Sequence, residues 1–204
     1  MKSVYYILMS FLFFFCNKPE QKTTYPTEKK DTAVSVQKHP KFNTYWNTGK
    51  AEITSYTLTQ SRYGQIHQGT AVNIFVTEEF LPNKQVKADN QDEHNISILK
   101  LNSTKKFVTG IYPYSLMTST FTPIYNSQKA IKISFSSQEW CGNTFVQLNN
   151  RAQFEIDFRS YFETNADKKM VLTKNILEND LWNLLRINPK KLPIGNFNSI
   201  PSFE

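Results

Sequence analysis

The stretch at residues 130–162 reads AIKISFSSQEWCGNTFVQLNNRAQFEIDFRSYF, and it predicts the fold class. Apolar residues occupy every second position in 131–135 and again in 154–158, a period that is typical of strands with one buried face. The asparagine pair at 149–150 fits a tight turn, because asparagine tolerates the positive φ that such turns require. Gly142 predicts a bulge or a close approach of the backbone. The stretch is therefore interpreted as the central hairpin of a sheet.

Other extended segments lie on both sides of this hairpin. The predicted strands are 52–58, 70–78, 96–102, 107–109, 111–122 and 170–172. In the first two, apolar and polar residues alternate well enough to predict a hairpin with a long, glycine-containing loop. The polar residues at 103–106 predict a turn between the next two.

One amphipathic helix is predicted at about 175–186, where five apolar residues fall on one helical face. Asn188-Pro189 ends it. The chain also has 16 Phe and 10 Tyr among its 204 residues, and aromatic enrichment favours pleated sheets. The sequence thus predicts a mainly β protein, an antiparallel curved sheet or open barrel with one C-terminal amphipathic helix.

The N-terminus resembles the signal segment of bacterial lipoproteins. Lys2 precedes an apolar run at 4–15, which is shorter than the roughly 20 apolar residues that span a bilayer and has the length of a signal h-region. Cys16 follows directly, and in lipoproteins of this pattern the cysteine is acylated and becomes the first mature residue. Phe15 stands where the pattern has a small residue, and an uncleaved apolar anchor is the alternative.

This resemblance sets the expected domain organisation. Residues 1–15 would be the signal segment and 16–42 a flexible tether, because a polar segment with three prolines buries too little surface to become ordered. Residues 43–204 would form a single β-rich domain. Two acyl chains on Cys16 would hold the protein stably on a membrane. Asn17 takes the place of the aspartate that marks inner-membrane retention, so the resemblance implies the outer membrane.

The formal net charge is +7, but the basic residues are spread along the chain in short pairs. No run is long enough to form a nucleic-acid-binding arm. Solvated strand edges and loops account for this distribution, and no nucleic-acid partner is expected.

Common catalytic motifs are absent from the sequence. It contains no P-loop and no G-x-G-x-x-G, G-x-S-x-G, H-E-x-x-H or C-x-x-C. The three histidines are far apart in the chain. We therefore assign no catalytic residue, cofactor or metal site from the sequence.

Cys141 and several carboxylates remain as candidates for chemistry. A nucleophilic cysteine needs an adjacent base, and Glu139 serves poorly because its negative charge disfavours the thiolate. Cys141 is therefore interpreted as a small buried apolar residue. A carboxylate pair, Glu139 with Glu163 or Glu78-Glu79 with Asp89, is the alternative for hydrolysis.

A set of polar and aromatic residues is the better candidate for ligand binding. Side chains of these types recur in sites for sugars, nucleotides and anionic headgroups. The residues are Arg62, Tyr63, Trp140, Cys141, Asn149 and Arg151. Packing and turn formation are the alternative roles.

Five segments together resemble a family of Gram-negative envelope lipoproteins that carries the label "septum formation inhibitor Maf". The segments are 46–64, 78–89, 99–117, 138–150 and 185–195. Cytoplasmic Maf proteins are nucleotide pyrophosphatases with an S-x-S-P-R-R motif and alternating strands and helices. This chain has no such motif, so the family label does not carry that activity over to it.

The function expected from these observations is that of a lipid-anchored envelope protein. It would act as a non-catalytic binding or structural module for an apolar ligand, a glycan or an envelope protein. The alternative is a hydrolase, either the nucleotide pyrophosphatase that the family label implies or one that uses Cys141 or a carboxylate pair.

Overall fold

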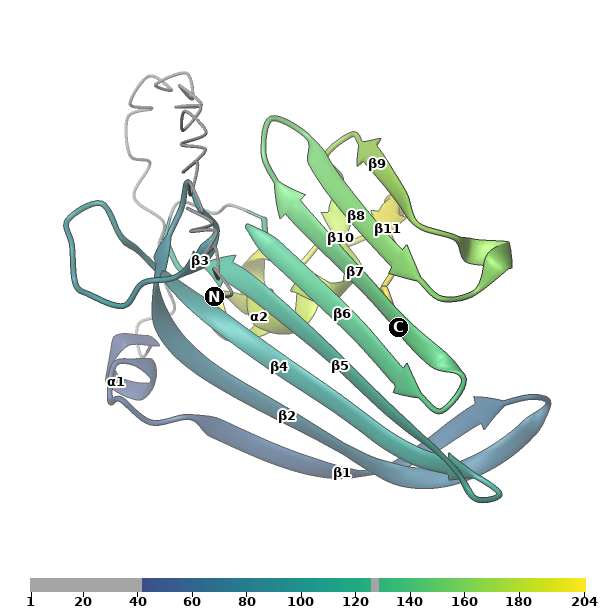
Figure 1. Ribbon diagram of the computed structural model, residues 1–204. Helices are drawn as coiled ribbons and strands as arrows, with labels where there is room; N and C mark the ends of the chain where they lie inside the picture. Colours follow the sequence, from purple (N-terminus) through teal and green to yellow (C-terminus); the bar gives the residue numbers. More distant parts are fainter. Residues whose placement is uncertain (1–41, 126–128) are drawn as a thin grey trace, which may run out of the picture. The chain divides into compact units, whose positions relative to one another are not determined.

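The computed structural model describes residues 42–125 and 129–204 (Figure 1). The predicted signal segment, Cys16 and residues 17–41 of the predicted tether lie outside the described residues. Residue 42, assigned to the tether from the sequence, begins the short helix α1 (Phe42–Trp46). The described part of the chain has no helix long and apolar enough to cross a membrane.

Nine strands form one antiparallel sheet. They are β1 (Glu52–Arg62), β2 (Gln65–Leu81), β3 (Val86–Lys87), β4 (Ile96–Thr109), β5 (Tyr112–Pro123), β6 (Lys132–Glu139), β7 (Gly142–Asn150), β8 (Phe154–Ser160) and β9 (Lys168–Leu172). Strand β3 pairs with the end of β2, and the other eight lie in the order β1-β2-β4-β5-β6-β7-β8-β9. Within 42–125 and 129–204 no pairing joins β1 to β9, so the sheet stays open. The predicted mainly β, open antiparallel architecture is confirmed.

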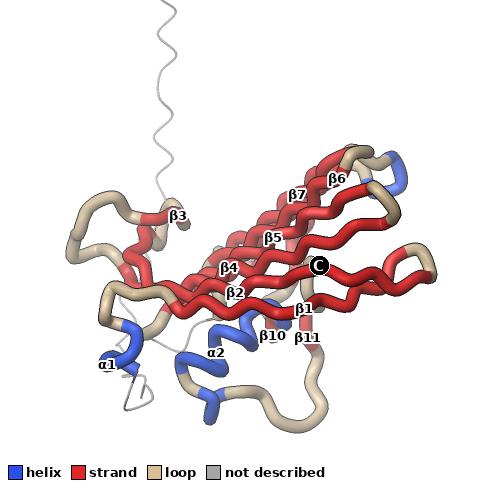
Figure 2. Tube along the Cα trace, turned by 90° about the horizontal axis from the view of Figure 1, so that it is seen from below, coloured by secondary structure: helices blue, strands red, loops and turns tan. Residues whose placement is uncertain are grey.

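The C-terminal elements lie on one side of this sheet, as the view from below shows (Figure 2). They are β10 (Ile176–Leu177), a 3₁₀ turn at Glu178–Asp180, α2 (Leu181–Ile187), a 3₁₀ turn at Pro189–Lys191 and β11 (Ser199–Ile200). Strands β10 and β11 pair in parallel, and α2 packs against β4 and β5. We call the side of the sheet that they cover the inner face.

The register explains which residues the C-terminal elements bury. One continuous row of directly paired residues crosses the inner face: Phe75, Leu101, Thr120, Ile133, Leu148 and Ile156. All six are less than a tenth exposed. On β6 to β8 the inner face forms one apolar cluster with Leu177, and on β2 and β4 it forms a second with α1 and Ile187.

Buried polar contacts attach the helix to the sheet. The amide nitrogen of Asn183 donates to the carbonyl of Leu99 at 3.0 Å and to Thr122 Oγ1 at 2.8 Å. Thr122 Oγ1 in turn donates to Asp180, whose other oxygen accepts from the backbone nitrogen of Ala130 at 2.9 Å. These directional bonds set the position of α2 along β4 and β5, which apolar packing alone would leave less defined.

Two predicted turns are wrong. Residues 103–106 continue strand β4 without interruption. The asparagines at 149–150 belong to strand β7, and the chain turns at 140–141 and 151–153 instead. The stretch at 130–162 is thus three strands, not one hairpin. The long loop predicted before residue 70 is also wrong, because Tyr63 and Gly64, with φ of 53° and 73°, close β1 and β2 in a two-residue turn.

The helix and Gly142 also differ in detail from the prediction. Helix α2 starts at Leu181 and not near 175, because Ile176 and Leu177 extend to pair with β11. Gly142 begins β7 immediately after a turn. The close approach expected there exists, but its partner is a side chain: a Cβ on Gly142 would lie 2.7 Å from Cδ1 of Tyr161.

Candidate functional site

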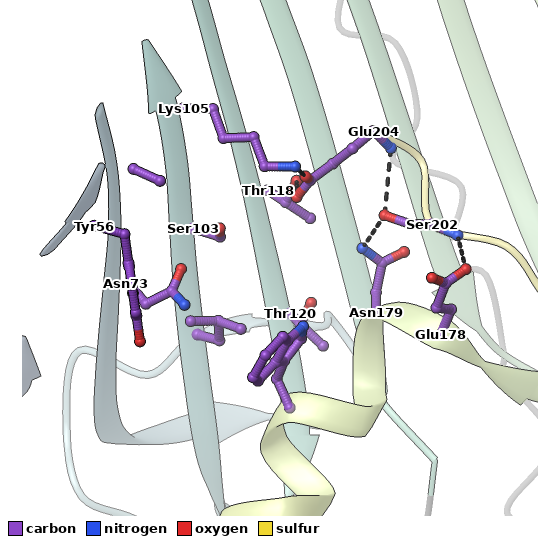
Figure 3. A pocket seen from close by; sticks show the side chains of 13 residues that line it. Tyr56, Asn73, Ser103, Lys105, Thr118, Thr120, Glu178, Asn179, Ser202 and Glu204 are labelled. Atoms are coloured by element: carbon purple, nitrogen blue, oxygen red, sulfur yellow. Dashed lines mark hydrogen bonds and ion pairs between the residues drawn. The ribbon is translucent and has the colours of Figure 1, made fainter. Parts of the chain in front are cut away.

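A pocket of about 400 Å³ lies between the inner face and the C-terminal segment, and Figure 3 shows the side chains that line it. Strands β1, β2, β4 and β5 form its floor, and the turn at Glu178–Asp180, helix α2 and residues 202–204 form its wall. We call it the inner-face pocket. Its volume falls in the range of small-molecule sites, about 300–1,000 Å³.

Small and polar residues on the floor create the space. Asn73 pairs with Ser103, and Ser103 pairs with Thr118, so three polar side chains lie side by side across β2, β4 and β5. In the neighbouring row Ala71 pairs with Lys105. These positions border the two apolar clusters, and larger side chains there would have filled the volume under the C-terminal segment.

The wall is fixed by its own hydrogen bonds. Asn179 Nδ2 donates to Ser202 Oγ at 3.0 Å, and the backbone nitrogen of Ser202 donates to Glu178 Oε2 at 3.0 Å. Phe203 packs against the apolar cluster of β6 to β8. Residues 202–204 are therefore held beside the pocket through both backbone and side chain.

The Glu204 carboxylate reaches across the pocket to the floor. Lys105 Nζ forms an ion pair with Glu204 Oε2, and Thr118 Oγ1 donates to Glu204 Oε1 at 2.8 Å. Figure 3 shows Lys105 and Glu204 meeting over Thr118. This contact joins β4 and β5 to the C-terminal segment.

Several lining groups remain available to a ligand. Within the part of the chain that the structure describes, the side chains of Tyr56, Asn73 and Ser103 have no hydrogen-bond partner. Two aromatic residues also line the pocket, Tyr56 at 46% and Trp182 at 54% exposure. The pocket therefore offers partly exposed rings together with unused amide and hydroxyl groups.

Part of the predicted binding set gathers at a second place, where three hairpins turn. Arg62, Tyr63 and Cys141 line a cavity of about 330 Å³ at that edge of the sheet, which we call the hairpin-edge cleft. The other lining residues are Thr109, Tyr112, Tyr114, Glu139 and Phe162. The Trp140 ring lies beside it, with its centroid 5.4 Å from that of Tyr112.

The tyrosine hydroxyls of the hairpin-edge cleft already have hydrogen-bond partners. The hydroxyls of Tyr63 and Tyr114 are 2.9 Å apart, and the guanidinium of Arg62 lies 4.9 Å from the ring centroid of Tyr63 and 5.1 Å from that of Tyr114. The Tyr112 hydroxyl accepts from the backbone nitrogen of Cys141. Burial, with the neighbouring Cys141, raises the pKa of Tyr112 to about 12, and burial raises the pKa of Tyr114 as well. Both phenols therefore stay protonated at neutral pH, and each hydroxyl is already engaged.

Asn149 and Arg151 do not join that cleft. They lie at the far end of β7, where Asn149 Nδ2 donates to Gln85 Oε1 and Arg151 Nη1 donates to the carbonyl of Asn83 at 2.6 Å. Gln85 is buried, has a φ of 54° and donates to the carbonyl of Asn150. These contacts hold the turn after β2 against the end of β7.

The candidates for hydrolysis come together only in part. Glu139 and Cys141 line the hairpin-edge cleft, but Glu163, the predicted partner of Glu139, is not among its lining residues. Cys141 is exposed, which contradicts its interpretation as a buried apolar residue, and no histidine lines the cleft. Glu78 faces Lys100 at 3.4 Å, whereas Glu79 accepts from Ser97 Oγ at 2.7 Å. Adjacent strand residues point to opposite faces, so these two carboxylates do not act on one substrate. In the described residues, no group of three His, Cys, Asp or Glu side chains could hold a metal ion.

Comparisons with protein-family models, curated proteins and solved structures find no match to this chain. The inner-face pocket was missed from the sequence. A signal for it existed in the strand alternation. Asn73, Ser103 and Thr118 are polar residues at positions whose side chains point to the covered inner face.

Proposed function

We propose that this chain is a lipid-anchored binding protein of the bacterial cell envelope that holds a glycan in the inner-face pocket without catalysis. The anchor is Cys16, expected from the apolar run that precedes it. The observation that carries the ligand class is the combination of Tyr56 and Trp182 with the unused side chains of Asn73 and Ser103.

A saccharide suits both kinds of group at once. The C–H face of a sugar ring packs on aromatic rings, and its hydroxyls need hydrogen-bond partners that amides and hydroxyls provide. A protein ligand site typically places a few polar groups around such apolar surfaces. The side chains of Asn73 and Ser103 on the floor would each form a hydrogen bond to a bound glycan.

An apolar ligand suits the pocket less well. It would cover Asn73, Ser103 and the Lys105–Glu204 pair without forming hydrogen bonds to them. Burying an unpaired amide or hydroxyl costs about 1–3 kcal/mol in proteins. The chemistry of the floor thus favours the glycan over a lipid among the expected ligands.

The bonds that the pocket carboxylates already form support a binding role. Glu178 accepts from the backbone nitrogen of Ser202, and Glu204 accepts from Thr118 and pairs with Lys105. A hydrolase would need a nucleophile or a carboxylate pair aimed at one bond.

Tryptophan fluorescence tests the proposal on the full chain in mild detergent. Soluble chitotriose and maltotriose are the probes, and the change in emission is followed during titration. We expect a saturable change that is lost in Trp182→Phe and kept in Trp140→Phe, because only Trp182 lines the pocket. A change that disappears in Trp140→Phe instead would place the ligand at the hairpin edge and refute the site.

A further inference from the structure

We infer that the glycan of the inner-face pocket is acidic, and that its carboxylate takes the place of the Glu204 side chain on Lys105 and Thr118. This inference rests on the proposed function and specifies its ligand class. It is carried by a contact inside the protein: a carboxylate already occupies the floor.

The floor forms a two-point carboxylate site. Lys105 on β4 provides the cation and Thr118 on β5 provides a hydroxyl donor, one to each oxygen of Glu204. Thr118 is buried, at 3% exposure, and the side chain of Lys105 is 30% exposed. Charge-assisted hydrogen bonds of this kind are stronger than neutral ones. The arrangement binds any carboxylate of suitable reach, whether it belongs to the protein or to a ligand.

Glu204 can leave this site without unpacking the segment that carries it. Ser202 and Phe203 hold the segment through Glu178, Asn179 and the apolar cluster. The backbone nitrogen of Glu204 donates a hydrogen bond to Ser202 Oγ at 3.4 Å. Rotation of the Glu204 side chain alone would expose Lys105 and Thr118 to a ligand.

The exchange also leaves Lys105 paired with one carboxylate. Lys105 is the only cation among the lining residues, whereas Glu178 and Glu204 are the anions. A neutral ligand would sit beside an intact ion pair and gain nothing from Lys105. An acidic ligand would replace one carboxylate by another, while Glu204 moves toward water and regains its hydration. An acidic ligand would thus displace Glu204 from its ion pair with Lys105.

Matched saccharides test the inference. N-acetylmuramic acid is compared with N-acetylglucosamine, and glucuronic acid with glucose, by NMR titration of the full chain in mild detergent. Each pair differs in whether a carboxylate is present. We expect the acidic member of each pair to bind more tightly, with chemical-shift changes at Thr118 that the neutral member does not cause.

Two variants distinguish displacement of the Lys105–Glu204 ion pair from a change in overall structure. Lys105→Met keeps the length of the side chain and should reduce the acidic-to-neutral affinity ratio to about one. Glu204→Gln removes the competing charge and should tighten acidic binding about two- to fivefold, the range of a partly exposed ion pair. High salt should lower the ratio in the wild type.

The outcomes distinguish the two proposals. Equal binding of acidic and neutral members, with shifts in the pocket, overturns the acidic class and leaves glycan binding intact. An acidic preference that survives in Lys105→Met overturns the role of Lys105. No binding of any member, together with no response to chitotriose or maltotriose, overturns both.

Discussion

Asp180 gives a prediction whose size follows from its surroundings. Its side chain is only 2% exposed, and it accepts from Thr122 and from the backbone nitrogen of Ala130. Burial raises the pKa of Asp180 to about 6, because the charged form loses its hydration in the protein interior. The two hydrogen bonds oppose this shift without cancelling it.

The sign of the stability effect follows from the direction of the shift. The pKa in the folded state exceeds the ordinary value of 3.8, so between these pH values the folded protein binds a proton that the unfolded chain has released. The contribution of Asp180 is fully present below about pH 4 and is lost as the pH rises through about 6. A shift of about two units corresponds to roughly 3 kcal/mol, at about 1.4 kcal/mol for each unit.

The substitution Asp180→Asn removes the titration and keeps the shape of the side chain. Urea unfolding of both proteins between pH 4 and pH 7.5 gives the difference in the free energy of unfolding at each pH. Taking the difference cancels the groups that titrate equally in both proteins. We expect the variant to gain roughly 2–3 kcal/mol relative to the wild type from the acidic to the neutral end. A difference that is constant across this range would refute the reasoning.

Three further predictions concern packing and accessibility. Gly142→Ala should destabilise the protein by about 1–3 kcal/mol in urea unfolding, since its Cβ meets the Tyr161 ring; an equal cost in a Tyr161→Ala background would contradict this cause. Phe154→Ala should cost about 3–5 kcal/mol in the same assay because Phe154 is fully buried, and a cost below about 1 kcal/mol would argue against the core of β6 to β8. Cys141 should react with a thiol reagent in the native protein, with Cys141→Ser as control; labelling that begins only in denaturant would contradict its exposure.

The sheet could be predicted from the sequence because its signal is local. Phe154, Ile156 and Phe158 alternate, and so do the residues of β2, and each pattern requires only a few neighbouring positions. The interpretation failed at 103–106, where polar residues indicated a turn. Ser103 and Lys105 are in fact strand residues that face the inner-face pocket. The polar character that marks this site was therefore taken for the polar character of a loop.

The residues of the candidate binding set come together only in part, for a different reason. Arg62, Tyr63, Trp140 and Cys141 come together because β1–β2 and β6–β7 turn at the same edge of the sheet, and Arg151 lies at the other end of β7. Which turns share an edge depends on strand order and register, which are long-range properties. Pairings of this kind are not contained in any single segment of the sequence.

The contact between the C-terminal segment and the floor has the same origin. Thr118 and Glu204 are 86 positions apart, and Trp182 reaches the pocket only because Asp180 and Asn183 fix α2 against β4 and β5. The helix was recognisable from its apolar period, but its docking depends on buried polar bonds. Those bonds join residues that are far apart in the sequence.

Intermolecular NOEs between a bound saccharide and the aromatic rings test the central claim most directly. The measurement uses N-acetylmuramic acid with the full chain in mild detergent. NOEs from the sugar-ring protons to the rings of Trp182 and Tyr56 would locate the ligand in the inner-face pocket, and this is the result that we predict. NOEs to Tyr63 and Trp140 alone would contradict it and assign the ligand to the hairpin edge.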